Sequence, residues 1–161
     1  MFTSAAAEEA AEEADAAEEY VSAELYARIQ QFYHRQMGLL DDGRAEEWAD
    51  TFTEDALFLE PLRLEPLRGR EAIRTSARAR ADRLAAEQLD FRHWLNMLDV
   101  RHLDDGSVFT RVYALPMRTP RGGGLDIFAS VVCRDQLVAV GDGWQVRRRE
   151  IHHDGAEAGS Q

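Results

Sequence analysis

A histidine in the segment "FRHWLN" (residues 91–96) is the first candidate for chemistry. Side chains alternate between the faces of an extended strand, which places Phe91, His93, Leu95 and Met97 on one face and Arg92, Trp94, Asn96 and Leu98 on the other. The first face is the more apolar, so we expect His93 to point inward. An inward imidazole is either a core residue with its hydrogen bonds satisfied or a general acid and base.

Two adjacent carboxylates, Asp41 and Asp42, stand at a joint between two apolar-striped segments in "FYHRQMGLLDDGRAEEWADTF" (residues 32–52). Helix capping explains at least one of them, because a carboxylate can accept hydrogen bonds from the free amides of the next helix. Two carboxylates exceed the need of one cap. We therefore expect one of them to face a cavity and hold the ring of His93, which would fix the tautomer of that ring.

Two other polar segments are weaker candidates. His152 and His153 are neighbours on a predicted strand, so they face opposite ways and cannot share a metal; with Asp154 they fit a frayed, polar strand end. The segment "RGGGLD" (residues 121–126) lies between predicted strands, so no helix N-terminus stands behind it to bind phosphate. It is predicted to be a hairpin loop.

The remaining acidic and phenolic candidates lie in strands of mixed pattern. Pro116 implies a bulge or a strand edge, which leaves the register open. The faces on which these side chains lie are therefore undetermined, and a buried carboxylate among them would be a candidate base. They are Asp126, Asp135, Glu150 and Tyr113.

Composition excludes several kinds of chemistry. All 19 basic residues are arginine, so no lysine is present to form a Schiff base, an internal pyridoxal phosphate linkage or a phosphate loop. The single cysteine, Cys133, excludes an intrachain disulfide and a cysteine-rich zinc site and suits a reducing cytoplasm. A net charge of −11 argues against a nucleic-acid partner. We expect no cofactor and no metal.

Periodicity predicts the elements that must position these residues. Apolar residues recur at helical spacing over residues 22–40 and again over 45–52, and an arginine-rich third helix follows within 65–84. A short strand precedes it at 56–61. Four long segments rich in Val, Leu, Phe and Ile (89–103, 108–119, 125–140 and 144–153), separated by turn residues, predict an antiparallel meander. Such a sheet must coil, and three helices against it would enclose a conical cavity.

These elements form one predicted α+β domain over residues 21–153. Residues 1–20 are an acidic Ala/Glu-rich extension and residues 154–161 are small and polar; we expect both to be disordered. Neither a signal peptide nor an apolar run long enough to span a membrane is apparent, so a cytoplasmic protein without a membrane partner is expected.

The order and spacing of three segments resemble a known family. "LLDDGRAEEWADTFTEDALFLEP" (39–61), "FRHWLN" (91–96) and "GDGWQVRRREIHHD" (141–154) are together similar to the SnoaL-like group of the nuclear transport factor two-like superfamily. The resemblance covers about residues 22–153. It implies a cone-shaped α+β barrel of the cystatin-like kind with an apolar pocket, often forming a homodimer through its sheet.

One branch of this superfamily, scytalone dehydratase with related polyketide cyclases and isomerases, implies catalysis. It has an acid seven residues before a helix tryptophan, here Asp41 before Trp48, and a strand histidine, here His93. By this resemblance Asp41 would orient His93, which would move a proton beside a substrate carbonyl. The branch's second histidine and the tyrosine before the acid have no counterparts here, so scytalone itself is not the expected substrate.

The resemblance implies a hydrophobic polyketide-like or aromatic substrate of bacterial secondary metabolism and a cyclase, dehydratase or isomerase reaction. Asn96 or Tyr113 could hold the developing oxyanion. The expected substrate-binding residues are Asn96, Tyr113, Tyr33, Trp48, Phe58, Met97 and Asp126.

A second branch, the β subunits of aromatic-ring-hydroxylating dioxygenases, implies no catalysis. Residues 31–61 resemble the start of such subunits and residues 133–151 their end. These subunits pack against an iron-bearing α subunit and carry no catalytic residues. Asp41 and His93 would then be structural polar groups bonded to each other. A non-catalytic ligand-binding protein is the third alternative.

Overall fold

The computed structural model describes residues 20–156, which form three helices and a seven-stranded sheet. The elements in chain order are α2 (Ala23–Asp41), α3 (Ala45–Ala49), β1 (Phe52–Leu59), β2 (Leu67–Arg68), α4 (Arg70–Ala86), β3 (Leu89–His102), β4 (Val108–Pro120), β5 (Asp126–Ile127), β6 (Val131–Val140) and β7 (Gly143–His153). The predicted α+β class is confirmed. The expected disorder of residues 1–20 and 154–161 falls mostly on residues outside the described range.

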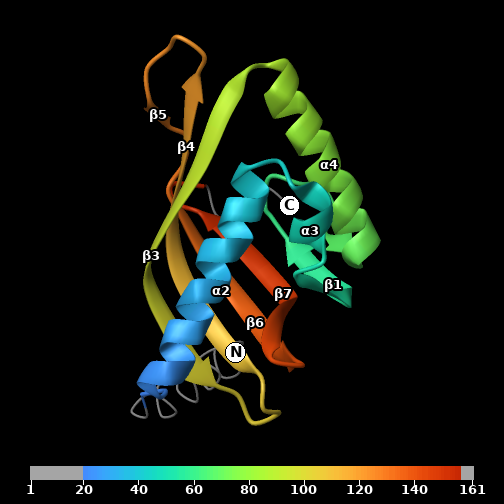
Figure 1. Ribbon diagram of the computed structural model, residues 1–161, viewed down its shortest axis with the longest axis vertical. Coiled ribbons are helices and arrows are strands. Elements are labelled where there is room, and N and C mark those ends of the chain that lie inside the picture. The colour runs from blue at the N-terminus through green and yellow to red at the C-terminus, as the bar shows by residue number, and fades with distance from the viewer. Residues whose placement is uncertain (1–19, 157–161) are drawn as a thin grey trace, which may run out of the picture.

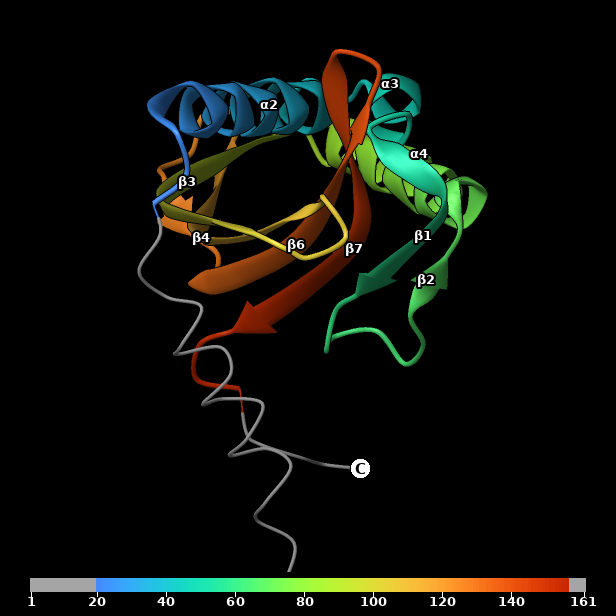
Figure 2. The ribbon, with the colours of Figure 1, turned by 90° about the horizontal axis from the view of Figure 1, so that it is seen from below.

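The sheet is curved and does not close into a barrel. Its strand order is β2-β1-β7-β6-β4-β3, with β5 paired to β4. The pairing of β1 with β7 is parallel and all other pairings are antiparallel. Figure 1 shows β3 running past α2 to the end of α4, with β4 beside it leading to β5, and Figure 2 shows the three helices on one side of the curved sheet. The concave side is therefore the side on which a pocket can form.

Helix α2 ends in a turn that places two carboxylates differently. Gly43 has φ +73°, its N–H donates to the carbonyl of Leu40, and the N–H of Arg44 donates to the carbonyl of Leu39. This is the Schellman arrangement, which needs a left-handed residue after the helix. Asp41 is the last helical residue and Asp42 the C-cap. The predicted capping of the next helix by an aspartate is wrong, because α3 has no side-chain cap.

The third long strand predicted from the sequence is interrupted. Residues 126–127 pair with β4 as β5, and β6 starts only at Val131. The N–H of Phe128 in the gap donates to the carbonyl of Pro116, 2.8 Å away. The ring of Phe128 lies 6.0 Å from that of Phe91.

A charged network lies inside the core rather than at the surface. Arg149 donates from Nε and Nη2 to the carboxylate of Asp135, at 2.9 and 2.6 Å, and both side chains are nearly inaccessible to solvent. Asp135 also accepts from the hydroxyl of Tyr33 at 2.7 Å, and Gln36 accepts from Arg149 at 2.7 Å. Each charged group is thus paired, as burial requires.

Burial sets the protonation of this network. Burial, followed by the charge of Asp135, raises the pKa of Tyr33 well above its ordinary value. The same two causes raise the pKa of the Cys133 thiol, whose Sγ lies 3.3 Å from Asp135. Burial lowers the pKa of Arg149, but the carboxylate of Asp135 outweighs this and the pKa is raised overall. The folded chain therefore holds a neutral phenol, a neutral thiol and a charged guanidinium together.

Candidate active site

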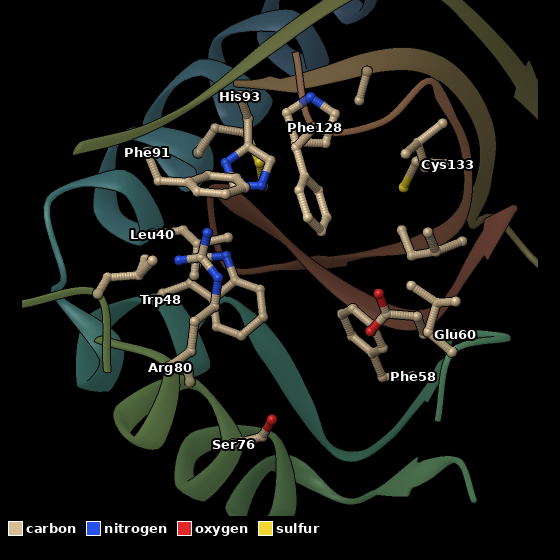
Figure 3. Close-up of a pocket in the computed structure, with 18 of the residues that line it drawn as sticks. Leu40, Trp48, Phe58, Glu60, Ser76, Arg80, Phe91, His93, Phe128 and Cys133 are labelled. Atoms are coloured by element: carbon tan, nitrogen blue, oxygen red, sulfur yellow. The ribbon is translucent and has the colours of Figure 1, made fainter. Parts of the chain in front are cut away.

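A pocket of about 440 Å³ opens between α4, the end of α2 and the concave face of the sheet. This volume lies in the range of sites for small molecules. Its wall is largely aliphatic and aromatic, with a few polar and charged groups. Prominent lining residues are Leu40, Trp48, Phe58, Glu60, Arg80, Leu84, Phe91, His93, Phe128, Cys133 and His153, several of which are labelled in Figure 3.

Asp41 and His93 are bonded to each other at the wall of this pocket. His93 Nδ1 lies 2.5 Å from Asp41 Oδ1, and the backbone N–H of His93 donates to Asp41 Oδ2 at 3.0 Å. The side chains are only 16% and 10% exposed. Because Asp41 accepts a hydrogen bond from Nδ1 of His93, Nε2 is the ring nitrogen that remains available to other partners. Among residues 20–156, no side chain or backbone group bonds to Nε2.

The pair joins two elements that are 52 residues apart in the chain. The last turn of α2 supplies Asp41, and β3, held opposite Pro116 of β4, supplies His93. The ring of Phe91 lies 5.2 Å from that of His93 and restricts its tilt. The carboxylate contacts both the ring and the backbone of His93, so it fixes the position of the strand as well as the orientation of the imidazole.

A second histidine and carboxylate lie in the same pocket. His153 Nε2 is 3.6 Å from Glu60 Oε1, and the His153 side chain is 15% exposed. The expectation that His152 and His153 form a frayed end is wrong for His153, which shares its strand face with Ile151, another lining residue. The alternation of side chains along the strand, which places Ile151 and His153 on the same face, was the signal in the sequence that His153 points inward. His152 is exposed, beside Glu150.

Two of the predicted substrate-binding residues line the pocket. Trp48 and Phe58 are both in its wall, with ring centroids 6.4 Å apart. Within the described part of the chain, the indole N–H of Trp48 is buried without an acceptor. Tyr33 instead belongs to the buried network with Asp135.

The other four predicted substrate-binding residues are described but do not line the pocket. The expected inward orientation of Met97 is wrong: a bulge between Asn96 and Asp99, with Met97 at φ +56°, changes the alternation, and Met97 is 64% exposed. Asn96 is exposed and its Oδ1 accepts from the N–H of Met97. Tyr113, paired with Asn96 across the strands, shares that outer face.

The three carboxylates whose strand faces the sequence left open are each bonded to an arginine. Asp126 is exposed and pairs with Arg118 at 2.8 Å. Asp135 is buried but fully engaged by Arg149, and Glu150 pairs with Arg148. The pKa of Glu150 is lowered, because the hydrogen bond and charge of Arg148 outweigh the opposing effect of partial burial. None of the three faces the pocket with an unbonded carboxylate.

The described residues contain neither a cluster that could bind a metal nor a helix that could span a membrane. In the described range 20–156, no three His, Cys, Asp or Glu side chains lie together so that they could hold a metal ion. No helix within that range has the length and apolar character needed to cross a membrane.

Comparison with known proteins places this geometry in a family. The SnoaL-like domain family matches residues 21–150. Aln2 from a Streptomyces species is 36% identical, with a TM-score of 0.77 over 84% of this chain and 95% of that one. A protein from Catenulispora acidiphila, in complex with S-DNPA, is 38% identical, with a TM-score of 0.71 over 83% of this chain and 96% of that one.

A more distant structure supports the fold alone. An NTF2-like protein with a cystatin-like fold, from Novosphingobium aromaticivorans, is 22% identical, with a TM-score of 0.69 over 81% of this chain and 83% of that one. No curated protein matches the sequence. The family match over most of the domain and the 36% identity to Aln2 agree with the resemblance found in the sequence, and the chain belongs to the SnoaL-like family.

Proposed function

We propose that this chain is an enzyme that uses no cofactor and moves a proton on a hydrophobic polyketide-like or aromatic substrate, resulting in cyclisation, dehydration or isomerisation. One observation carries the proposal: Asp41 and His93 are bonded at the wall of a pocket of about 440 Å³. A pocket of this size can enclose a two- or three-ring substrate, and its aromatic wall suits flat rings.

The orientation of His93 suggests its role. Nε2 accepts a proton from the carbon next to a substrate carbonyl, which leaves an enolate, while Nδ1–H stays bonded to Asp41. The imidazolium formed is balanced by the Asp41 carboxylate. It then returns the proton, either to another carbon of the enolate, which isomerises the substrate, or to a leaving hydroxyl, which departs as water. Asp41 is a positioning residue and His93 the catalytic one.

The non-catalytic β subunit is the competing proposal. A subunit that only supports a partner needs no open cavity, so side chains can fill its pocket. The lining residues leave about 440 Å³ of open space. This space favours a protein that binds a small molecule over a supporting subunit.

We also propose a homodimer formed through the sheet. The outer face of β3 and β4 exposes apolar side chains that pair across the strands, among them Trp94 with Leu115, and Trp94 is 69% exposed. Such a patch on a soluble domain commonly marks a contact surface. Sedimentation equilibrium at micromolar concentration measures this, and a monomer for the unmodified chain would contradict it.

A proton-transfer probe tests the catalytic proposal without the natural substrate. The probe is 2-tetralone in D₂O, whose C1–H exchange is followed by NMR. We expect the protein to accelerate exchange and His93→Gln to lose about 100-fold or more of that acceleration, the usual contribution of a general base. His102→Gln is the matched control, since His102 lies on the same strand but is exposed. Equal exchange by His93→Gln and the unmodified protein would remove His93 from the mechanism.

A further inference from the structure

Arg80 differs from the other arginines of α4 in being partly buried without a bonded partner. Arg70 donates to a backbone carbonyl, and Arg74 and Arg78 pair with carboxylates. Arg83 has no bonded partner among residues 20–156, but it is exposed at the rim of the pocket. Among the residues that the structure describes, none forms a hydrogen bond or an ion pair with the guanidinium of Arg80. A guanidinium has five N–H donors and does not lose its proton in proteins, so water or a ligand must supply acceptors for this cation.

The position of Arg80 directs those donors into the pocket. Its side chain lines the pocket, with Cζ 4.6 Å from the centre of the Phe91 ring. Figure 3 shows the guanidinium pointing toward Phe91 and His93, with Glu60 farther away beside Phe58. A guanidinium over a ring face is stabilised through its flat side, which leaves the N–H groups at its edge unbonded.

The surroundings of Arg80 make its positive charge energetically unfavourable in the folded protein. Partial burial lowers the pKa of Arg80; the carboxylates of Asp41 and Glu60 oppose this, and the cation of Arg83 adds to it. Neither carboxylate bonds to Arg80, because Asp41 accepts twice from His93 and Glu60 accepts from Arg63 at 3.2 Å. A partly desolvated cation without a bonded anion is unfavourable for folding, and such an arrangement is expected where a ligand supplies the anion.

We propose that Arg80 is a carboxylate-binding subsite and that the ligand of this pocket is an aromatic or polyketide-like acid. The planar fork of a guanidinium matches the two oxygens of a carboxylate, while Phe91 and Phe128 provide an apolar surface for the rest of the ligand. The inference rests on the proposed function only in taking this pocket as the substrate site. It names the substrate class, and binding tests it separately from turnover.

The experiment compares two probes of nearly equal shape, 2-naphthoate and the neutral 2-naphthamide, by isothermal titration calorimetry. The unmodified protein should bind 2-naphthoate about 10- to 100-fold more tightly, the range expected for charge-assisted hydrogen bonds. Arg80→Gln should lose that preference and bind both probes about equally. Arg78→Gln, on the same helix, removes the same charge from an exposed position outside the pocket and should change the preference by less than about 3-fold.

Each outcome decides one proposal. Equal binding of the two probes by the unmodified protein, or an unchanged preference in Arg80→Gln, would overturn the carboxylate subsite. Circular dichroism of Arg80→Gln confirms that a lost preference does not come from unfolding. His93→Gln should keep the preference, since it acts after binding. If it keeps the preference and also keeps full exchange of 2-tetralone, the catalytic role of His93 fails while the subsite stands.

Discussion

Two side-chain pairs of the described chain, Asp135 with Arg149 and Asp41 with His93, have opposite surroundings. Asp135 and Arg149 lie inside the core, where Tyr33, Cys133 and Gln36 complete their hydrogen bonds. Asp41 and His93 lie at the pocket, where one ring nitrogen has no partner from residues 20–156. A network with every group satisfied can hold a fold in one arrangement but has nothing to offer a ligand. The pair at the pocket keeps one ring nitrogen unbonded, and that is where chemistry can occur.

The largest effect on stability is expected when one partner of the buried network around Asp135 and Arg149 is removed. Asp135→Ala leaves Arg149 buried with its charge uncompensated, which typically costs about 3 to 5 kcal/mol of unfolding free energy. Urea denaturation followed by tryptophan fluorescence measures it. The surface pair provides the control: Asp126→Ala should cost less than about 0.5 kcal/mol. A similar small cost for Asp135→Ala would show that the core network does not stabilise the fold.

A smaller loss of stability and a larger loss of function are expected at the pocket. The two bonds use different carboxylate oxygens, and an amide has only one acceptor oxygen, so Asp41→Asn cannot present a separate acceptor atom to His93 Nδ1 and to the backbone N–H of His93. We expect a cost of about 1 to 2 kcal/mol in the same denaturation experiment. Exchange of 2-tetralone should fall about 10-fold or more, because the imidazole is no longer held in one tautomer. A stability loss as large as that of Asp135→Ala would erase the distinction between the two pairs.

The smallest expected effect is the dependence of stability on alkaline pH. The folded-state pKa values of Tyr33 and Cys133 are raised, so the unfolded chain loses these protons first and stability falls as pH rises above about 9 to 10, where the unfolded groups ionise. Each group contributes at most about 1.4 kcal/mol per pH unit. Tyr33→Phe should therefore flatten the decline above about pH 10, while its difference from the unmodified protein stays constant below about pH 8. An equally steep decline in Tyr33→Phe would contradict the burial of an ionisable phenol.

The sequence predicted those parts of the site that depend on local periodicity. Strand alternation places His93 inward because β3 is regular from Leu89 to Asn96. The same rule failed for Met97, since a bulge with a left-handed residue has no clear signature in residues 96–99. The aspartates next to Gly43 suggested a cap, but the Schellman turn left one carboxylate available for a strand 52 residues away.

The parts that the sequence did not predict depend on contacts across the sheet. Asp135 and Arg149 pair because β6 and β7 align these two residues, which only the register decides. Arg80 is one arginine among several on α4, and which of them faces the pocket depends on how the helix packs against β3. His153 was missed for a different reason, because its place near the end of the last strand suggested fraying.

The end of α2 also makes the position of Asp41 along the helix as important as its chemical type. Each residue of a helix advances the side-chain direction by about 100°. Insertion of one residue between Leu40 and Asp41 would therefore rotate the carboxylate by more than a quarter turn around the helix axis and away from the imidazole, although every original residue was kept. Natural or designed relatives that use the same pair should therefore keep Asp41 and Gly43 at this spacing, while the intervening residue can vary.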